Sequence, residues 1–137
     1  MFTVSAKAIY GLCAMLHLGQ NYNNGPTQIR EIAQAHNIPQ HYLEQLLVQL
    51  KKTGLVESYR GALGGYSLSK PPSKLMVAAI LECLDGKIEV VPEHKKENAA
   101  AFFWNDLQTF IEQKVNITLE DLLLQHQDTK NKLSYTI

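Results

Sequence analysis

The chain of 137 residues has few cysteines and no long apolar run. Its two cysteines, Cys13 and Cys83, are too few for a disulfide framework. No apolar segment approaches the roughly 18 residues that a membrane-spanning helix needs. The apolar N-terminal segment has neither a leading basic region nor a small-residue cleavage site, so it does not resemble a signal peptide. We therefore expect a cytoplasmic protein that does not bind a membrane.

Motifs of catalysis and of metal binding are also missing. The sequence contains no nucleophile elbow, no paired carboxylates in a catalytic context and no Walker loop. Its five histidines do not have the two- or three-ligand spacing that is typical of zinc sites, and they are His17, His36, His41, His94 and His126. We therefore predict that the protein is not an enzyme and binds no metal or other cofactor.

The chain as a whole lacks an excess of either charge, but its two parts carry opposite net charges. The net charge is zero. Residues 1–80 carry seven basic and three acidic side chains, whereas residues 81–137 carry six and ten. Apolar residues make up 45% of the sequence, enough for one domain with a core. The difference in charge between residues 1–80 and 81–137 indicates that the first part of the chain binds an anion.

The spacing of apolar residues predicts a helix-turn-helix. Residues 4–18 are apolar on almost every side, which predicts a buried helix. A short helix is expected over 28–36 with Thr27 as its N-cap, and a second over 40–53 with leucines on one side. The turn between them places Ile38 towards the core. Two short helices joined by such a turn are typical of DNA-binding proteins.

A hairpin is predicted to follow directly. Residues 55–60 and 65–69 are strand candidates, and the glycine-rich stretch 61–64 connects them. This loop does not match a nucleotide-binding motif, and Pro71 and Pro72 disfavour the helix that a phosphate site would need next. A hairpin after a helix-turn-helix is a wing. Arg60 at its tip suits the narrow, electronegative minor groove of DNA.

The remaining sequence predicts further helices. We expect a short helix over 77–84, a loop over 87–98 with one strand at 88–91, a helix over 99–115, and a last turn or two from a Thr118 cap to Leu124. The fold class is mainly α with a small β-hairpin. The expected domains are a winged helix-turn-helix (1–86), a regulatory loop (87–98), a dimerisation helix with a C-terminal turn (99–124) and a polar, partly disordered tail (125–137).

The exposed face of the second helix supplies candidate DNA contacts. Polar side chains near its start can read base edges in a major groove, and lysines at its end can meet phosphates. The wing glycines shape the tip and permit close approach of the backbone to DNA. The candidates from the helix are Gln40, His41, Glu44, Gln45, Lys51 and Lys52, and those from the wing are Arg60, Gly61, Gly64 and Gly65.

Three segments carry a family resemblance: VSAKAIYGLCAMLHL, IREIAQAHNIPQHYLEQLLVQLKKTGLVESYRGALGGYSLSKPP and ITLEDLL. They resemble the IscR/NsrR/CymR family of bacterial winged-helix repressors. The resemblance implies a homodimer that binds a palindromic promoter operator and dimerises through a long C-terminal helix. It adds Tyr42 to Glu44, Gln45 and Arg60 as DNA-contacting residues. It also assigns dimerisation to 103–115, whose apolar stripe consists of Phe103, Leu107, Phe110 and Ile111.

The loop before that helix departs from the cluster-binding members, which carry three cysteines there. Residues 87–104 read KIEVVPEHKKENAAAFFW and contain no cysteine. A 2Fe–2S cluster needs four ligands, which His94 alone cannot supply, so we predict no cluster. The effector stays open among a redox thiol at Cys13 or Cys83, a small metabolite held between the DNA-binding part and the dimer helix, and a partner protein. The alternative function is a degenerate member that binds proteins and no longer binds DNA.

Overall fold

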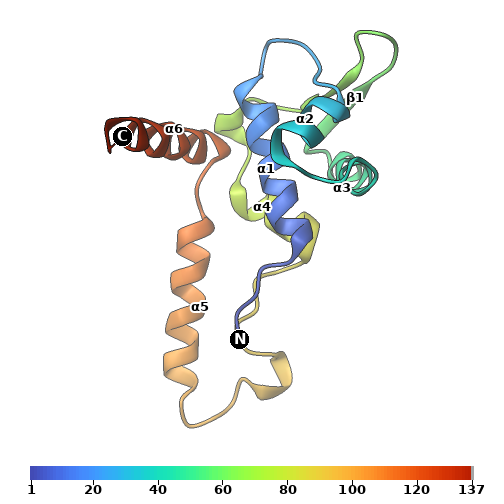
Figure 1. Ribbon diagram of the computed structural model, residues 1–137. Helices are drawn as coiled ribbons and strands as arrows, with labels where there is room; N and C mark the ends of the chain where they lie inside the picture. Colours follow the sequence, from blue (N-terminus) through green and yellow to red (C-terminus); the bar gives the residue numbers. More distant parts are fainter. Residues whose placement is uncertain (137) are drawn as a thin grey trace.

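The computed structural model describes residues 1–136, and side chains up to residue 133. Figure 1 shows a compact body of helices with a hairpin at one end and a long helix standing apart from it. None of the helices in these residues is long and apolar enough to cross a membrane. The elements in chain order are α1 (Ala6–Gln20), α2 (Ile29–His36), α3 (Gln40–Lys52), β1 (Val56–Tyr59), β2 (Gly65–Leu68), η1 (Pro72–Lys74), α4 (Val77–Asp85), η2 (Glu93–Lys95), α5 (Ala101–Val115) and α6 (Leu119–Thr136).

Helix α1 lies at the centre of the body and packs against α2, α3, α4 and α6. Ser5 caps its start, because the Ser5 hydroxyl accepts a hydrogen bond from the Ala8 amide at 3.2 Å. Its apolar residues are distributed around the helix, as expected for an element with neighbours on several sides. Met15 and Ala14 are fully buried in the same cluster as the leucines of α3. The predicted buried N-terminal helix is therefore confirmed, over Ala6–Gln20.

The helix-turn-helix is confirmed. Helix α2 ends at His36, and Asn37 after it adopts the left-handed conformation (φ 52°). Ile38 in the turn is 4% exposed. Helix α3 then buries one side on α1, α2 and α4. Its leucines recur every three or four residues, so they line one face of the helix, and this face consists of Leu43, Leu46, Leu47 and Leu50.

The expected role of Thr27 is wrong. The structure shows no side-chain hydrogen bond at the N-cap of α2, which is Gln28. Thr27 instead pairs with Tyr66 of β2: each amide donates to the other residue's carbonyl oxygen at 2.8 Å. Thr27 thereby adds a third extended segment beside the hairpin and is 6% exposed. This pairing attaches the hairpin to the start of α2.

The hairpin is confirmed as a wing. Strands β1 and β2 pair antiparallel from Val56 opposite Leu68 to Tyr59 opposite Gly65. Val56 and Leu68 are buried against the core, so the base of the hairpin is fixed while its tip projects (Figure 1). The Gly64 amide donates to the Gly61 carbonyl at 3.0 Å, which closes the turn at the tip.

The C-terminal half differs from the expectation in two places. The strand expected at 88–91 does not form; these residues are irregular and lead to η2. Residues 125–136, expected as a polar and partly disordered tail, continue α6 as a helix, so the expected end at Leu124 is wrong. Residue 137 lies outside the described residues. The expected helix over 99–115 is confirmed as α5, starting two residues later.

Helix α6 begins with the predicted Thr118 cap. The Thr118 hydroxyl accepts from the Asp121 amide, and the Asp121 carboxylate accepts from the Thr118 amide, both at 3.0 Å. This reciprocal pair is a capping box, in which the side chains satisfy two amides that lack helical partners. Leu119 is fully buried, and its amide donates to the Leu75 carbonyl at 2.7 Å. The start of α6 is thus fixed to the body of the winged domain.

Candidate nucleic-acid interface

The outer face of α3 carries most of the predicted helix contacts. Six of the candidates on this helix are exposed, and Tyr42 is half-buried. The amide of Gln45 lies 3.4 Å from the imidazole of His41, one helical turn earlier. Side chains at this spacing share a face. The exposed residues therefore form one polar surface, which consists of Gln40, His41, Glu44, Gln45, Lys51 and Lys52.

Two side chains of α3 differ from a simple exposed face. Gln49, which the helical spacing places on the polar side, donates its amide to the Cys83 carbonyl of α4 at 2.7 Å. The ring of Tyr42 packs edge-on against Tyr10 of α1 at a centroid distance of 5.8 Å. Gln49 therefore positions α3 on α4, and Tyr42 combines packing with its predicted DNA contact.

Lysine and carboxylate side chains connect α3 to the wing. The ammonium group of Lys51 donates to the Ser58 hydroxyl of β1 at 2.5 Å. The negative charge of Glu44 acts on Tyr66 of β2: burial first, and then this charge, raises the pKa of the tyrosine. The hydrogen bond from Lys51 to Ser58 places the wing beside the outer face of α3. The two predicted reading elements are therefore adjacent in the fold.

The tip of the wing presents an available arginine. Arg60 is exposed and forms no hydrogen bond or ion pair with any part of the chain that the structure describes. Leu63 at the tip is 90% exposed. The side-chain amide of Gln28, at the start of α2, donates to the Ala62 carbonyl at 3.3 Å. Gln28 is a positioning residue that the sequence did not indicate, because the contact joins segments far apart in the chain.

The wing glycines differ in what their positions demand. Gly61 has a φ of +98° and open space around it. A Cβ on Gly64 would collide with the Tyr59 carbonyl, and a Cβ on Gly65 would collide with the Thr27 carbonyl. Gly64 and Gly65 therefore allow the tip to fold back and β2 to approach Thr27. These two glycines contribute to the candidate DNA-binding surface mainly by giving the wing its shape.

Both cysteines are free thiols and half-buried. Cys83 of α4 lies against the end of α3, with its sulfur 3.1 Å from the Thr53 hydroxyl. Cys13 packs on the core from α1. The two cysteines thus occupy separate positions, and a redox role for either stays a prediction.

The loop over 87–98 is held by one glutamine of α5. The side chain of Gln108 accepts from the Val90 amide at 2.8 Å and donates to the Ile88 carbonyl at 2.7 Å. The side-chain amide of Gln108 thus makes the backbone hydrogen bonds that a neighbouring strand would otherwise make. The loop offers His94 as its one imidazole and no thiolate. Among residues 1–136, no group of three or more histidine, cysteine or acidic side chains is placed to hold a metal ion.

Helix α5 is poorly covered by the rest of the fold. None of its residues, all of them described, is buried, and it packs on the body through α4. Figure 1 shows it extending away from the other helices. In the predicted stripe Phe103 is 55% and Phe110 is 69% exposed, while Leu107 and Ile111 are half-buried. Soluble monomers rarely leave such a set of large apolar side chains in water.

An open cleft of about 440 Å³ lies between α4 and α5. Its lining combines charged groups such as Glu82 and Lys87 with the apolar Ile88 and Val115. This cleft lies in the region where the sequence analysis expected a metabolite site as one of its three alternatives, between the DNA-binding part and the dimer helix.

Comparison with known proteins places these features in context. A model of the Rrf2 family, described as iron-dependent transcriptional regulators, matches residues 4–125. The chain is 38% identical to the HTH-type transcriptional regulator CymR of Bacillus subtilis over 121 residues, 87% of this chain and 88% of that protein. It is 33% identical to the HTH-type transcriptional regulator IscR of Yersinia enterocolitica over 128 residues, 88% and 78% of the two chains.

Solved structures agree with the fold. The structure of CymR, the global cysteine regulator of B. subtilis, superimposes with a TM-score of 0.84 at 37% identity and covers 91% of this chain and 98% of that one. IscR of T. potens gives a TM-score of 0.78 at 35% identity and covers 93% and 90% of the two chains.

Proposed function

The chain belongs to the Rrf2 family of helix-turn-helix transcriptional regulators, and we propose that it acts in the cytoplasm as a homodimeric repressor of promoters with a palindromic operator. The observation that carries this proposal is the adjacency of the polar face of α3 and the wing, joined by the bond from Lys51 to Ser58. Helix α3 enters the major groove, and Arg60 reaches the neighbouring minor groove. Lys51 and Lys52 meet phosphates.

The reading residues have separate tasks in this proposal. Gln40 and Gln45 exchange hydrogen bonds with base edges, and Glu44 accepts from an exposed base amine such as that of cytosine. His41 stands beside Gln45, and Tyr42 presents its hydroxyl end while its ring holds α3 on α1. Gly61, Gly64 and Gly65 give the wing the shape that brings Arg60 forward. The domain divisions at residues 86 and 98 belong to the same proposal, whereas the division at 124 is given up because α6 continues through it.

Selection from a pool of random duplex DNA tests the function. Protein bound to a support retains duplexes, which are amplified and sequenced over several rounds. We expect one enriched palindrome with half-sites about one or two helical turns apart, since a two-fold dimer spaces its recognition helices in this way. Failure to retain any duplex would instead favour the alternative, a family member that binds proteins and no longer binds DNA.

The exposed stripe of α5 supports a dimer formed along this helix. Alanine at Phe110 should raise the dissociation constant of the dimer about tenfold, because a buried aromatic anchor contributes more than most interface residues. Phe102→Ala is the matched control: Phe102 is 72% exposed on the same helix but lies about 100° around it from Phe103. Analytical ultracentrifugation measures both. Equal dissociation constants for the two variants and the wild type would place the dimer contact elsewhere.

The donor set does not fit an iron–sulfur cluster, although the family is described as iron-dependent. The loop that precedes α5 holds no cysteine, and Cys13 and Cys83 lie on α1 and α4. Protein purified without oxygen should therefore be colourless and contain far less than one iron per chain by elemental analysis. Visible absorption with stoichiometric iron and acid-labile sulfide would contradict this prediction. Regulation then depends on another effector, and the cleft between α4 and α5 is the proposed position for a small metabolite.

A further inference from the structure

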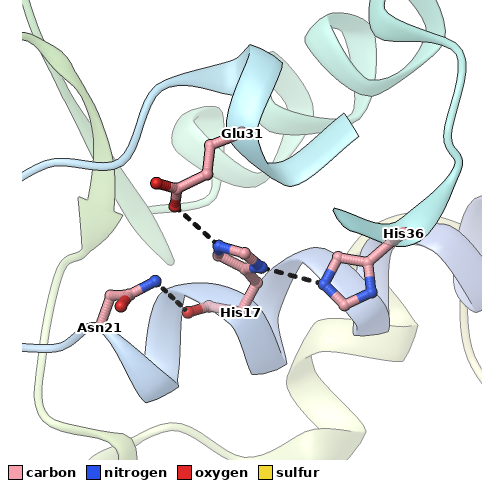
Figure 2. A network of polar contacts seen from close by, with 4 residues as sticks. All are labelled: His17, Asn21, Glu31 and His36. Atoms are coloured by element: carbon pink, nitrogen blue, oxygen red, sulfur yellow. Dashed lines mark hydrogen bonds and ion pairs between the residues drawn. The ribbon is translucent and has the colours of Figure 1, made fainter. Parts of the chain in front are cut away.

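Two histidines and a carboxylate meet where α2 packs on α1, and a third histidine lies on α6, which also packs on α1. His17 of α1 lies between Glu31 and His36, both on α2 (Figure 2). Its Nε2 is 2.9 Å from a Glu31 carboxylate oxygen, and its Nδ1 is 3.0 Å from Nε2 of His36. His126 of α6 is close enough for its charge to act on His36. These four side chains are called the histidine cluster below.

The distances fix the positions of the protons. A carboxylate only accepts hydrogen bonds, so Nε2 of His17 carries a proton and donates to Glu31. In neutral His17 the other nitrogen, Nδ1, then accepts the proton of His36 Nε2. The arrangement accommodates one added proton. With it, His17 carries protons on both ring nitrogens and lies beside the carboxylate of Glu31. Neutral His36 then holds its proton on Nδ1, so that its Nε2 accepts the hydrogen bond from His17. A further proton on His36 leaves two donors facing each other at 3.0 Å.

The surroundings of His36 disfavour that further proton. Burial first, then the charges of His17 and His126, lowers the pKa of His36 below its ordinary value of 6.5. Glu31, the one carboxylate of the cluster, lies on the far side of His17. The unfolded chain therefore binds this proton more readily than the folded chain. The stabilisation that depends on neutral His36 is complete above pH 6.5 and is lost as the pH falls from 6.5 through the lowered value.

The position of the cluster connects the protonation of His36 to the helix-turn-helix. His36 is the last residue of α2 and precedes Asn37, the left-handed residue of the turn before α3. Helix α6 packs on α1 and carries His126, and it follows directly on α5. Groups on α1, α2 and α6 therefore repel one another when the cluster collects charge.

We propose that His17, His36 and His126 form a proton-responsive joint that couples the C-terminal helix α6 to the helix-turn-helix. With one proton or none the three helices remain packed. With more, α2 and α6 separate from α1, and the turn that orients α3 loses its support. The proposal is independent of which DNA the protein binds.

Imidazole signals in NMR spectra between pH 5 and pH 8 test the electrostatic part. On the full chain we expect His36 to titrate below the ordinary histidine pKa of 6.5. His17→Gln and His126→Gln should each raise the midpoint of His36, because each removes a positive charge. A midpoint of His36 at or above 6.5 that neither substitution moves would overturn the proposal.

Thermal unfolding at pH 7.5 and pH 5.5 tests the coupling. Acid lowers the melting temperature of most proteins through carboxylates, so the readout is the difference between variants. His94→Gln should show the same drop as the wild type, whereas the drop of His36→Gln should be smaller by about 3 °C or more. The double variant His36→Gln/His126→Gln should show nearly the same drop in melting temperature as His36→Gln alone, because both substitutions remove the same repulsion. Equal drops in all chains would refute the joint.

Discussion

Alanine at Gly65 should lower the free energy of unfolding by about 2–4 kcal/mol, because it adds both backbone strain and a collision. Gly65 has a φ of +141°, which side chains disfavour, and its Cβ would lie 2.5 Å from the Thr27 carbonyl carbon and nearer to the oxygen. Thr27 cannot easily move away, since two hydrogen bonds of 2.8 Å hold it to Tyr66. Denaturant unfolding followed by circular dichroism measures the loss.

Gly54→Ala separates strain from collision. Gly54 also has a positive φ, +80°, but nothing lies within 4 Å of an added Cβ. We expect this control to lose about 1 kcal/mol from strain alone. If Gly65→Ala lost no more than Gly54→Ala, the close packing of the wing on Thr27 would not contribute to stability.

Glutamate at Arg60 should weaken operator binding at least a hundredfold, about 3 kcal/mol, because a favourable groove contact becomes a repulsion. The fold should be unaffected, since Arg60 is exposed and has no partner within the described chain. A binding titration with the selected operator measures the effect. The melting temperature of the variant should stay within a degree or two of the wild type.

Lys130→Glu is the matched charge reversal. Lys130 is exposed on α6, whose C-terminal end Figure 1 shows on the other side of the body from α3 and the wing. The same change in net charge should weaken operator binding severalfold at most, through the long-range field. Similar losses for the two variants would mean that Arg60 acts through net charge and not through a groove contact.

Local patterns predicted the helix-turn-helix because its determinants are local. The spacing of the leucines in α3 defines its buried side, and Asn37 to Pro39 interrupt the helical pattern. Long-range contacts decided the rest. Thr27 before a helix start is typical of an N-cap, but pairing with Tyr66 across the chain was more favourable. The apolar alternation at 88–91 suited a strand, yet within residues 1–136 no strand lies beside it, and Gln108 supplies the hydrogen bonds.

The end of α6 shows a limit of reading apolar periodicity. Its first turns are held by Leu119, Leu122 and Leu123 against the core. Residues 125–133 are largely exposed, so burial gives no signal there although many of them favour helix. In the candidate interface, the exposed face of α3 and the wing arginine followed from sequence. The roles of Gln28 and Gln49, and the histidine cluster, depend on how helices pack.

The affinity for the selected operator, compared with a scrambled duplex of the same length, tests the account most directly. Fluorescence anisotropy at fixed salt should show at least about a thousandfold tighter binding of the operator, with two chains per duplex. The affinity should fall steeply as salt is raised, because phosphate contacts release counterions. Equal affinity for the operator and the scrambled duplex would contradict sequence-specific recognition by α3 and the wing.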